Sequence, residues 1–169
     1  MPQSAGKIQA GRPDMPDGYG LAPVSGPNDL VRWQHVEEQL HTQRNYWISS
    51  TRPGGQPHAM PVWGVWMDGA FFFSTDPHSR KGRNLAANPE AVMHLESGDD
   101  VVILEGRVVV LSDPAILQTV DQAYYAKYQF HLAGDQAPPG TVYRLRPRAA
   151  FAWLEISFPT SATRWKFEE

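Results

Sequence analysis

The sequence predicts a mainly β fold of the α+β kind, a small antiparallel barrel of about seven or eight strands with short flanking helices. Its 169 residues include 14 Gly and 15 Pro without a collagen-like period, which is typical of a chain with many turns. Short runs of β-branched and aromatic residues lie between these turn formers. Barrel closure would remove exposed strand edges, and the length favours one domain with a single core.

The first part of the chain contains little apolar periodicity. Residues 1–27 hold five Gly and five Pro, so we expect a flexible arm that is mobile or becomes ordered only against a partner subunit. The folded domain then spans 28–169. Asn28 can cap a first helix, in which apolar residues recur at helical spacing as far as His41.

A three-stranded meander is predicted next. The segment 45–51 and the segment 58–67 contain strand formers, and Pro53-Gly54-Gly55 between them favours a turn. Asp68-Gly69 makes another tight turn into the strand 70–75. A short helix should then begin around Ser79, and it should end at Asn88-Pro89 because proline disfavours continued helix.

The second half continues with strands around one long helix. Gly106 interrupts a long β-branched run and suggests a bulge. Ser112-Asp113-Pro114 is a strong helix start, and an apolar stripe at i, i+4 spacing carries that helix to about Phe130. The expected strands of this half are 91–96, 101–111, 141–146, 151–156 and 163–167.

Composition excludes several classes of function. The net charge of −3 gives no overall attraction to nucleic acid or to anionic membranes. The absence of Cys excludes disulfides, thiolate metal sites and a cysteine nucleophile, and it is compatible with a reducing cytoplasm. No apolar run reaches the length that a membrane span needs, so we expect a cytoplasmic protein without membrane insertion. The six His residues lack metal-ligand spacing, which predicts no metal site.

The segment 73–89 carries the strongest functional signal. It follows a hydrophobic strand and opens a helix, and Arg80, Lys81 and Arg83 lie in or next to the first turn of that helix. Cationic side chains are unfavourable at a helix N-terminus because of the helix dipole, unless an anion is bound there. Arginine and lysine beside free backbone N–H groups suit a phosphate. A solvated basic helix face is the alternative interpretation.

Two stretches in this region resemble the pyridoxamine 5′-phosphate oxidase-like superfamily of split β-barrel flavoproteins. They are Ser79-Arg80-Lys81-Gly82-Arg83-Asn84-Leu85-Ala86-Ala87-Asn88-Pro89 and Val102-Ile103-Leu104-Glu105-Gly106-Arg107-Val108. The resemblance covers about residues 29–168 and implies a homodimer with cofactor sites at the subunit interface. It implies phosphate contacts from Arg80 and Lys81, supported by Thr75, Ser79 and Asn84. It also implies that the strand His58-Ala59-Met60-Pro61-Val62-Trp63 lies along the cofactor ring.

Departures from the superfamily pattern narrow the expected activity. True oxidases carry a Gln where this chain has Val101, and an Arg-x-His pair for which residues 160–165 offer no His. Vitamin B6 oxidation is therefore disfavoured. Pro61-Val62-Trp63-Gly64 and the terminal Arg164-Trp165-Lys166-Phe167 look more like actinobacterial members that use the deazaflavin coenzyme F-420, which reduce substrates by hydride transfer.

We therefore expect an F-420-dependent reductase acting on an unidentified organic acceptor of the enone, quinone or tetrapyrrole type. An FMN-dependent oxidoreductase and a non-catalytic cofactor- or haem-binding module are the alternatives. No side chain is assigned as an essential acid or base. Trp63 and Trp66 should point to opposite faces of their strand, because their separation is odd. His58 is either a cofactor contact or a surface residue, and the tyrosines at 124, 125 and 128 are expected to pack in the core or an interface.

Overall fold

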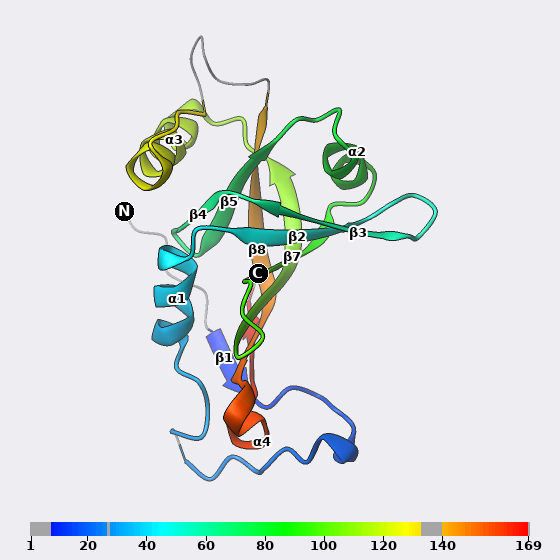
Figure 1. Cartoon of the computed structure of the whole chain (residues 1–169), viewed down its shortest axis with the longest axis vertical. Helices are drawn as coiled ribbons and strands as arrows, with labels where there is room; N and C mark the ends of the chain where they lie inside the picture. Colours follow the sequence, from blue (N-terminus) through cyan, green and yellow to red (C-terminus); the bar gives the residue numbers. More distant parts are fainter. Residues whose placement is uncertain (1–7, 27, 133–139, 169) are drawn as a thin grey trace.

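One antiparallel sheet runs through the molecule (Figure 1). The computed structural model describes residues 8–26, 28–132 and 140–168. The sheet order is β1-β9-β8-β7-β6-β2-β3, and β5 adds to β8 and carries β4 on its other side. The chain passes directly from β3 to β4 through Trp63, so the sheet curls into an open, split barrel. The predicted fold class is confirmed.

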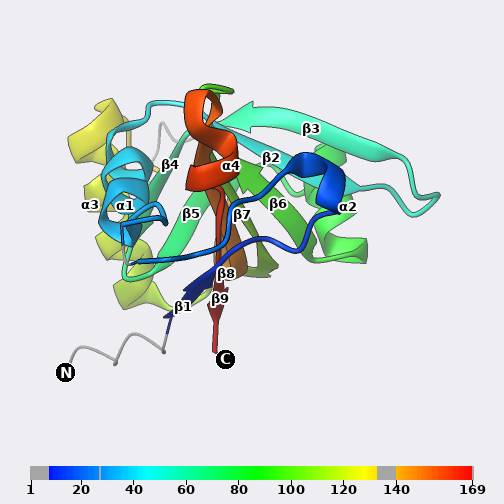
Figure 2. The same ribbon diagram turned by 90° about the horizontal axis from the view of Figure 1, so that it is seen from below.

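The elements follow the predicted sequence of turns and helices. The strands are β1 (Ile8–Gly11), β2 (Tyr46–Thr51), β3 (Pro57–Val62), β4 (Gly64–Met67), β5 (Ala70–Thr75), β6 (Glu90–His94), β7 (Asp100–Val110), β8 (Thr141–Leu154) and β9 (Thr163–Phe167). The helices are α1 (Trp33–Thr42), α2 (Arg80–Ala87), α3 (Pro114–Tyr128) and α4 (Phe158–Ser161), with 3-10 turns at Asp17–Tyr19 and Glu155–Ser157. Helices α1 and α3 lie on one side of the sheet and α2 on the other (Figure 2).

Strand β8 connects the two parts of the sheet. One of its edges pairs with β7 from Tyr143 to Leu154. The other edge pairs with β5 over its first five residues and with β9 over residues 149–152. Strand β8 therefore holds two parts of the sheet together. One part contains β5, which leads into α2, and the other contains β9 and the N-terminal strand β1.

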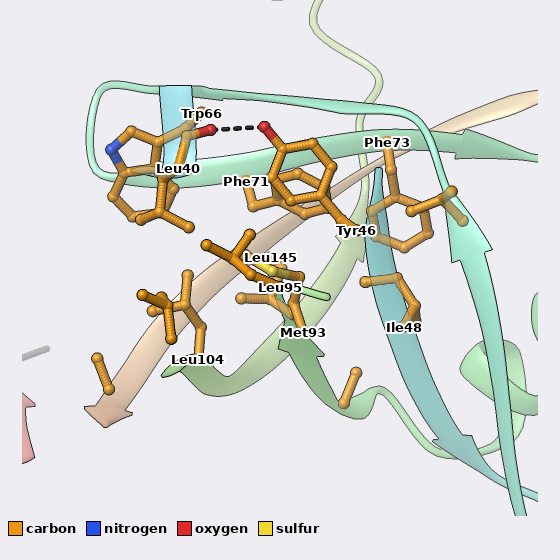
Figure 3. Close-up of a cluster of buried hydrophobic side chains, with 14 of the residues drawn as sticks. Leu40, Tyr46, Ile48, Trp66, Phe71, Phe73, Met93, Leu95, Leu104 and Leu145 are labelled. Atoms are coloured by element: carbon orange, nitrogen blue, oxygen red, sulfur yellow. Dashed lines mark hydrogen bonds between the residues drawn. The ribbon is translucent and has the colours of Figure 1, made fainter. Parts of the chain in front are cut away.

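The main core lies inside the barrel (Figure 3). Ile48, Phe73 and Leu145 are fully buried there, and Leu40 of α1 covers one end. The Tyr46 hydroxyl donates to the Leu40 carbonyl at 2.6 Å, so its polar end is satisfied within the apolar cluster. A second cluster joins α3 to the outer face of the β4–β5 hairpin, where it buries the side chains of Val65, Phe72, Val120, Tyr124 and Tyr128.

The N-terminal segment differs from its prediction. Residues 8–26 were expected to be mobile or to order only against a partner subunit, but β1 pairs with β9 of the same chain from Ile8 to Gly11. The Arg12 guanidinium then donates to the carbonyls of Ala22, Asp29 and Ala162. One partly buried arginine thus supplies the contacts that the apolar pattern lacks. Residues 1–7 of the predicted arm lie outside the described residues.

Three element boundaries also differ. Helix α1 begins at Trp33 and not at Asn28, because the Asp29 carboxylate accepts from the backbone N–H groups of Ser25 and Gly26 and closes a separate turn. The strand expected at 58–67 is broken at Trp63 into β3 and β4. The strands expected at 141–146 and 151–156 are one strand, β8, whose ladder with β7 continues past Pro147.

The β7–β8 register shifts between Glu105 and Gly106, where the sequence predicted a bulge, but the extra residue is Arg148 of the partner strand β8. A Cβ atom at Gly106 would lie 2.1 Å from the Arg146 carbonyl oxygen, which is a backbone atom of β8 and cannot move aside alone. The closest approach of β7 and β8 therefore requires a residue without a side chain.

We predict that Gly106→Ala destabilises the protein by about 1–3 kcal/mol, since overpacking against a fixed backbone is costly. Gly98→Ala, in the β6–β7 turn with no atom within 4 Å of its Cβ position, is the matched control and should be nearly neutral. Urea denaturation of both variants measures the difference. Equal stability of the two would contradict the close approach seen at Gly106.

Candidate functional site

The site begins where β5 ends and α2 starts. Ser79 is the N-cap of α2, and its hydroxyl oxygen accepts from the Gly82 N–H at 3.0 Å. The Thr75 hydroxyl lies 3.3 Å from the same oxygen, which links the end of β5 to the helix start. A Cβ atom at Gly82 would lie 2.5 Å from the Asp76 carbonyl, so the first turn of α2 packs directly on the preceding loop. The predicted Ser79 cap is present.

Lys81 is buried at this helix start without a counter-ion. Its side chain is 7% exposed, and no hydrogen bond or ion pair joins it to any other described residue. Desolvation by burial lowers the pKa of Lys81 to about 8. The Lys81 Nζ is not among the fully buried unpartnered atoms, so the ammonium group still reaches solvent at the start of α2, where it is available to an anion.

Two further polar groups around Lys81 lack partners. Asn84 is 1% exposed; its Nδ2 donates to the Ser50 hydroxyl at 3.1 Å, but its Oδ1 has no hydrogen-bond partner. His58 lies opposite Ser50 in the β2–β3 ladder, and its Nδ1 is likewise buried without a partner. Strands β2 and β3 and helix α2 therefore converge on one incompletely satisfied polar cluster, which we call the anion cluster: Ser50, His58, Ser79, Lys81 and Asn84.

The electrostatics of the anion cluster are positive. Desolvation lowers the pKa of His58, and the charges of Arg52, Lys81 and Arg80 lower it further. The neutral imidazole of His58 is thus favoured, and a bound anion would reverse that preference. Arg83, which the sequence placed among the cations, donates to the His78 carbonyl at 2.7 Å. The residues present fit a phosphate group, which accepts hydrogen bonds from lysine, imidazole and hydroxyl donors.

Strand β3 presents an open edge beside this cluster. It is the last strand of the sheet order and pairs with β2 alone in the described chain. Ala59, Met60 and Pro61 are exposed, so this part of the strand is accessible to a flat ligand. The side chain of Val62, by contrast, is buried in the core. Only the backbone of Val62 therefore remains for a ligand contact.

Trp63 lies at the other end of β3, away from the anion cluster and next to α3. Its carbonyl accepts from the Tyr124 hydroxyl at 2.5 Å, and its ring stacks on Tyr128 with centroids 4.7 Å apart. Trp66 is buried in the main core while Trp63 is 38% exposed, so the expected opposite orientation of the two rings is confirmed.

A pocket of about 400 Å³ adjoins Trp63. It is lined by Trp63, Ser74, Thr75, Asp76, Tyr124, Phe130, Leu132 and Gly140. From the sequence, Tyr124 was expected to pack in the core or in an interface, and Asp76 and Phe130 had no expected role. Tyr124 does pack in the α3 cluster, but its position in the i, i+4 stripe could not reveal that it also forms a pocket wall.

Among the described residues, no group of three or more potential metal ligands comes together. In the same part of the chain, no helix combines the length and apolar character that a membrane crossing needs.

Comparison with known families gives a match over residues 33–154 to the pyridoxamine 5′-phosphate oxidase family. The chain belongs to this family. The matched range contains the anion cluster, β3 and α3, so every part of the candidate site lies within the family domain. No curated protein matches the chain.

Solved structures share the fold at low sequence identity. A conserved hypothetical protein from Mycobacterium tuberculosis is 22% identical with a TM-score of 0.64, covering 73% of this chain and 85% of that one. An F-420 reductase is 23% identical with a TM-score of 0.54, covering 68% and 94%. A haem storage protein from Vibrio cholerae is 14% identical with a TM-score of 0.60, covering 73% and 96%. These likenesses establish the split-barrel fold.

We predict that Lys81→Met stabilises the ligand-free protein at pH 7 by about 1–3 kcal/mol, because it removes a buried charge whose pKa lies below its unfolded value. The cost of that charge is complete below pH 8 and fades as pH rises towards the unfolded pKa near 10.5. The difference in the free energy of unfolding between the Lys81→Met variant and the parent protein should therefore disappear by about pH 10. Urea denaturation across this pH range measures it. Lys166→Met, at an exposed position of β9, is the control and should show no such trend.

Proposed function

We propose that this family member is a homodimeric, deazaflavin-dependent reductase that transfers a hydride from coenzyme F-420 to an organic acceptor. The single observation that carries the proposal is the Lys81 ammonium, which has no counter-ion among the described residues, beside the unpartnered Nδ1 of His58. When bound, a deazaflavin supplies a hydride from its ring carbon, and the reduced acceptor takes a proton from solvent.

The residues of the chain divide the binding of such a cofactor between them. Lys81, Ser79 and Thr75 hold the phosphate at the start of α2, and Asn84 braces this cluster through Ser50. Arg80 and Arg52 are exposed around the same cluster and would neutralise the anionic tail of coenzyme F-420. The backbone from His58 to Trp63 lies along the ring, with Ala59, Met60 and Pro61 open to it.

An outer face of the sheet supports the proposed homodimer. Cross-strand pairing places five side chains in one row: Pro61, Trp47, His94, Ile103 and Phe151. Each is exposed or half-buried in the single chain, and the Trp47 and His94 rings stack at 6.2 Å. This outer row begins on β3, the proposed ring-binding strand. A second copy of the chain on the row would therefore also close the cofactor site.

We predict that Ile103→Asp converts the dimer to monomers and weakens cofactor binding, because a carboxylate within the row, between His94 and Phe151, would be desolvated without a partner. Val110→Asp, on the same strand at a position that is 60% exposed, is the control and should remain dimeric. Sedimentation velocity measures the mass. A monomeric parent protein, or a dimeric Ile103→Asp variant, would reject this face as the interface.

Cofactor choice is tested by offering coenzyme F-420, FMN and haem separately to the purified protein and measuring binding by absorbance and calorimetry. We expect tight binding of coenzyme F-420. The double variant Arg80→Ala/Lys81→Ala should lose at least about tenfold in affinity, since each charge-assisted hydrogen bond contributes roughly 1.5–3 kcal/mol. Arg148→Ala, which removes an exposed arginine paired with Glu90 elsewhere on the sheet, is the charge control.

Each alternative function has its own outcome in that experiment. Preference for FMN would replace the proposal by an FMN-dependent oxidoreductase. Haem binding without hydride transfer to any enone, quinone or tetrapyrrole would replace it by a binding module. Unchanged affinity in the double variant would move the phosphate site away from α2.

A further inference from the structure

Charged side chains lie at both ends of the outer sheet face, on either side of the outer row. One end, which we call the arginine end, holds four guanidinium groups of strands β7 and β8: Arg107, Arg144, Arg146 and Arg148. Arg107 lies directly opposite Arg146 in the β7–β8 ladder, and like charges in that position repel each other. Burial, and then the charge of Arg146, lower the pKa of Arg144. The arginines are therefore close enough to act on one another.

The arginine end has too few carboxylates to neutralise it. The Glu90 carboxylate pairs with two of the four cations, with Arg107 at 3.6 Å and with Arg148. The other two arginines form no ion pair or hydrogen bond with any residue that the structure describes. Glu105, which lies between this end and the outer row, is exposed and likewise forms no ion pair with a described residue. Positive charge therefore remains uncompensated at this end of the face.

The opposite end of the same strands carries unpaired carboxylates. This acidic end consists of three exposed side chains, in the β6–β7 turn and just after β8: Glu96, Asp99 and Glu155. It adjoins α4, at the foot of the molecule in Figure 1. The Glu155 N–H donates to the Asp99 carbonyl at 2.8 Å, so the two segments lie side by side. Asp100 is paired with His35, but the three carboxylates of the acidic end form no ion pair within the described chain.

The two charged ends lie at matching distances from the outer row. On β7, Arg107 follows Ile103 by four residues, and Asp99 precedes it by four. Arg146 lies beside Arg107 on the neighbouring strand. Glu155 lies beside Asp99. At about 3.3 Å per strand residue, each end is roughly 13 Å from the row. The cations and carboxylates of one chain are thus separated by far more than the screening length of about 8 Å, and they cannot pair with each other.

We propose that two copies of the chain pack through the outer row with their strands antiparallel, so that the arginine end of each copy meets the acidic end of the other. This inference rests on the homodimer of the proposed function, and it adds the direction and the charge pairs of the interface. A two-fold axis along the row reverses the strands of the second copy. Arg107 then faces Asp99 of the partner subunit, and Arg146 faces Glu155 of the partner subunit.

The charges select this arrangement against the other symmetric one. A two-fold axis along the strands would place the arginine end of one copy on the arginine end of the other, and the two acidic ends together. Like charges that meet across an interface disfavour the wrong arrangement strongly. Exposed ion pairs contribute little affinity one by one, so the apolar row supplies the affinity and the charged ends set the direction.

The test uses two charge-reversed variants of the full-length protein and their mixture. The first is Arg107→Glu/Arg146→Glu, and the second is Asp99→Lys/Glu155→Lys. Either variant alone would bring like charges together in an antiparallel dimer, so we expect its dimerisation to be at least about tenfold weaker than that of the parent protein. In the equimolar mixture every reversed group faces an opposite charge. A heterodimer of about parental affinity should therefore form.

Sedimentation equilibrium measures the affinities, and native mass spectrometry identifies the heterodimer by its mass. Glu37→Lys/Glu38→Lys, on helix α1, is the matched control because it has the same net charge as the second variant. Alone it should dimerise like the parent protein, and it should form less heterodimer with the first variant than the acidic-end variant does. If a substitution in the β6–β7 turn disturbs folding, Arg146→Glu and Glu155→Lys repeat the test at two exposed residues.

The outcomes separate this inference from the proposed function. Reversed variants that dimerise as well as the parent protein overturn the antiparallel arrangement. A mixture that recovers no more dimer than the mixture with the charge control also overturns it, and binding of coenzyme F-420 would in that case still support the reductase. Recovery in the mixture without any affinity for coenzyme F-420 supports the arrangement and rejects the deazaflavin reductase. A monomeric parent protein overturns both the arrangement and the proposed homodimer.

Discussion

The structure depends on the shared use of strand β8. Its ladder with β7 is continuous, while its other edge passes from β5 to β9. This is geometrically feasible because Gly106 has no Cβ, so the Arg146 carbonyl of β8 can approach the β7 backbone there, next to the bulge in the β7–β8 ladder. Both functional regions follow from this one strand. The anion cluster starts at the end of β5, which β8 holds in register, and the pocket lies over the same end of β5 under α3.

The candidate site stores unfavourable free energy that a ligand can relieve. Lys81 is largely buried and has no counter-ion among the described residues, and the nearby Nδ1 of His58 is buried without a hydrogen-bond partner. A fold selected for stability alone would replace these groups with apolar ones or pair them. An anion that enters this cluster gains hydrogen bonds and charge pairing that need no reorganisation of the protein, because β2, β3 and α2 already hold the donors in place.

Helix α3 holds one end of the proposed ring strand, at the break between β3 and β4, through its polar side chains. Tyr124 binds the Trp63 carbonyl, Tyr128 binds both the carbonyl and the N–H of Gly64, and Lys127 donates to the Tyr46 hydroxyl and to the Gly64 carbonyl. These bonds satisfy backbone groups at the break between β3 and β4, on the edge of β4 that no strand of the described chain covers. The break is therefore a defined feature that aims Trp63 out of the sheet, and it makes Trp63 common to the ring strand and the pocket.

Local sequence determined much of this protein by itself. Turn pairs such as Asp68-Gly69, the Ser79 cap and the Gly106 bulge act within a few residues, so periodicity and turn chemistry predicted the barrel, α2 and its cations correctly. Resemblance to family motifs added the roles of Lys81 and the β3 strand, which stay proposals. Tertiary structure alone decided the rest. The order of residues 8–26 depends on Arg12, whose side chain donates to carbonyls up to 150 positions away in the sequence. The merger of two predicted strands into β8 depends on pairing with β7. The pocket is lined by residues as far apart in the sequence as Trp63 and Gly140. Such contacts leave no local pattern, because their free energy comes from segments that meet only after the chain has folded.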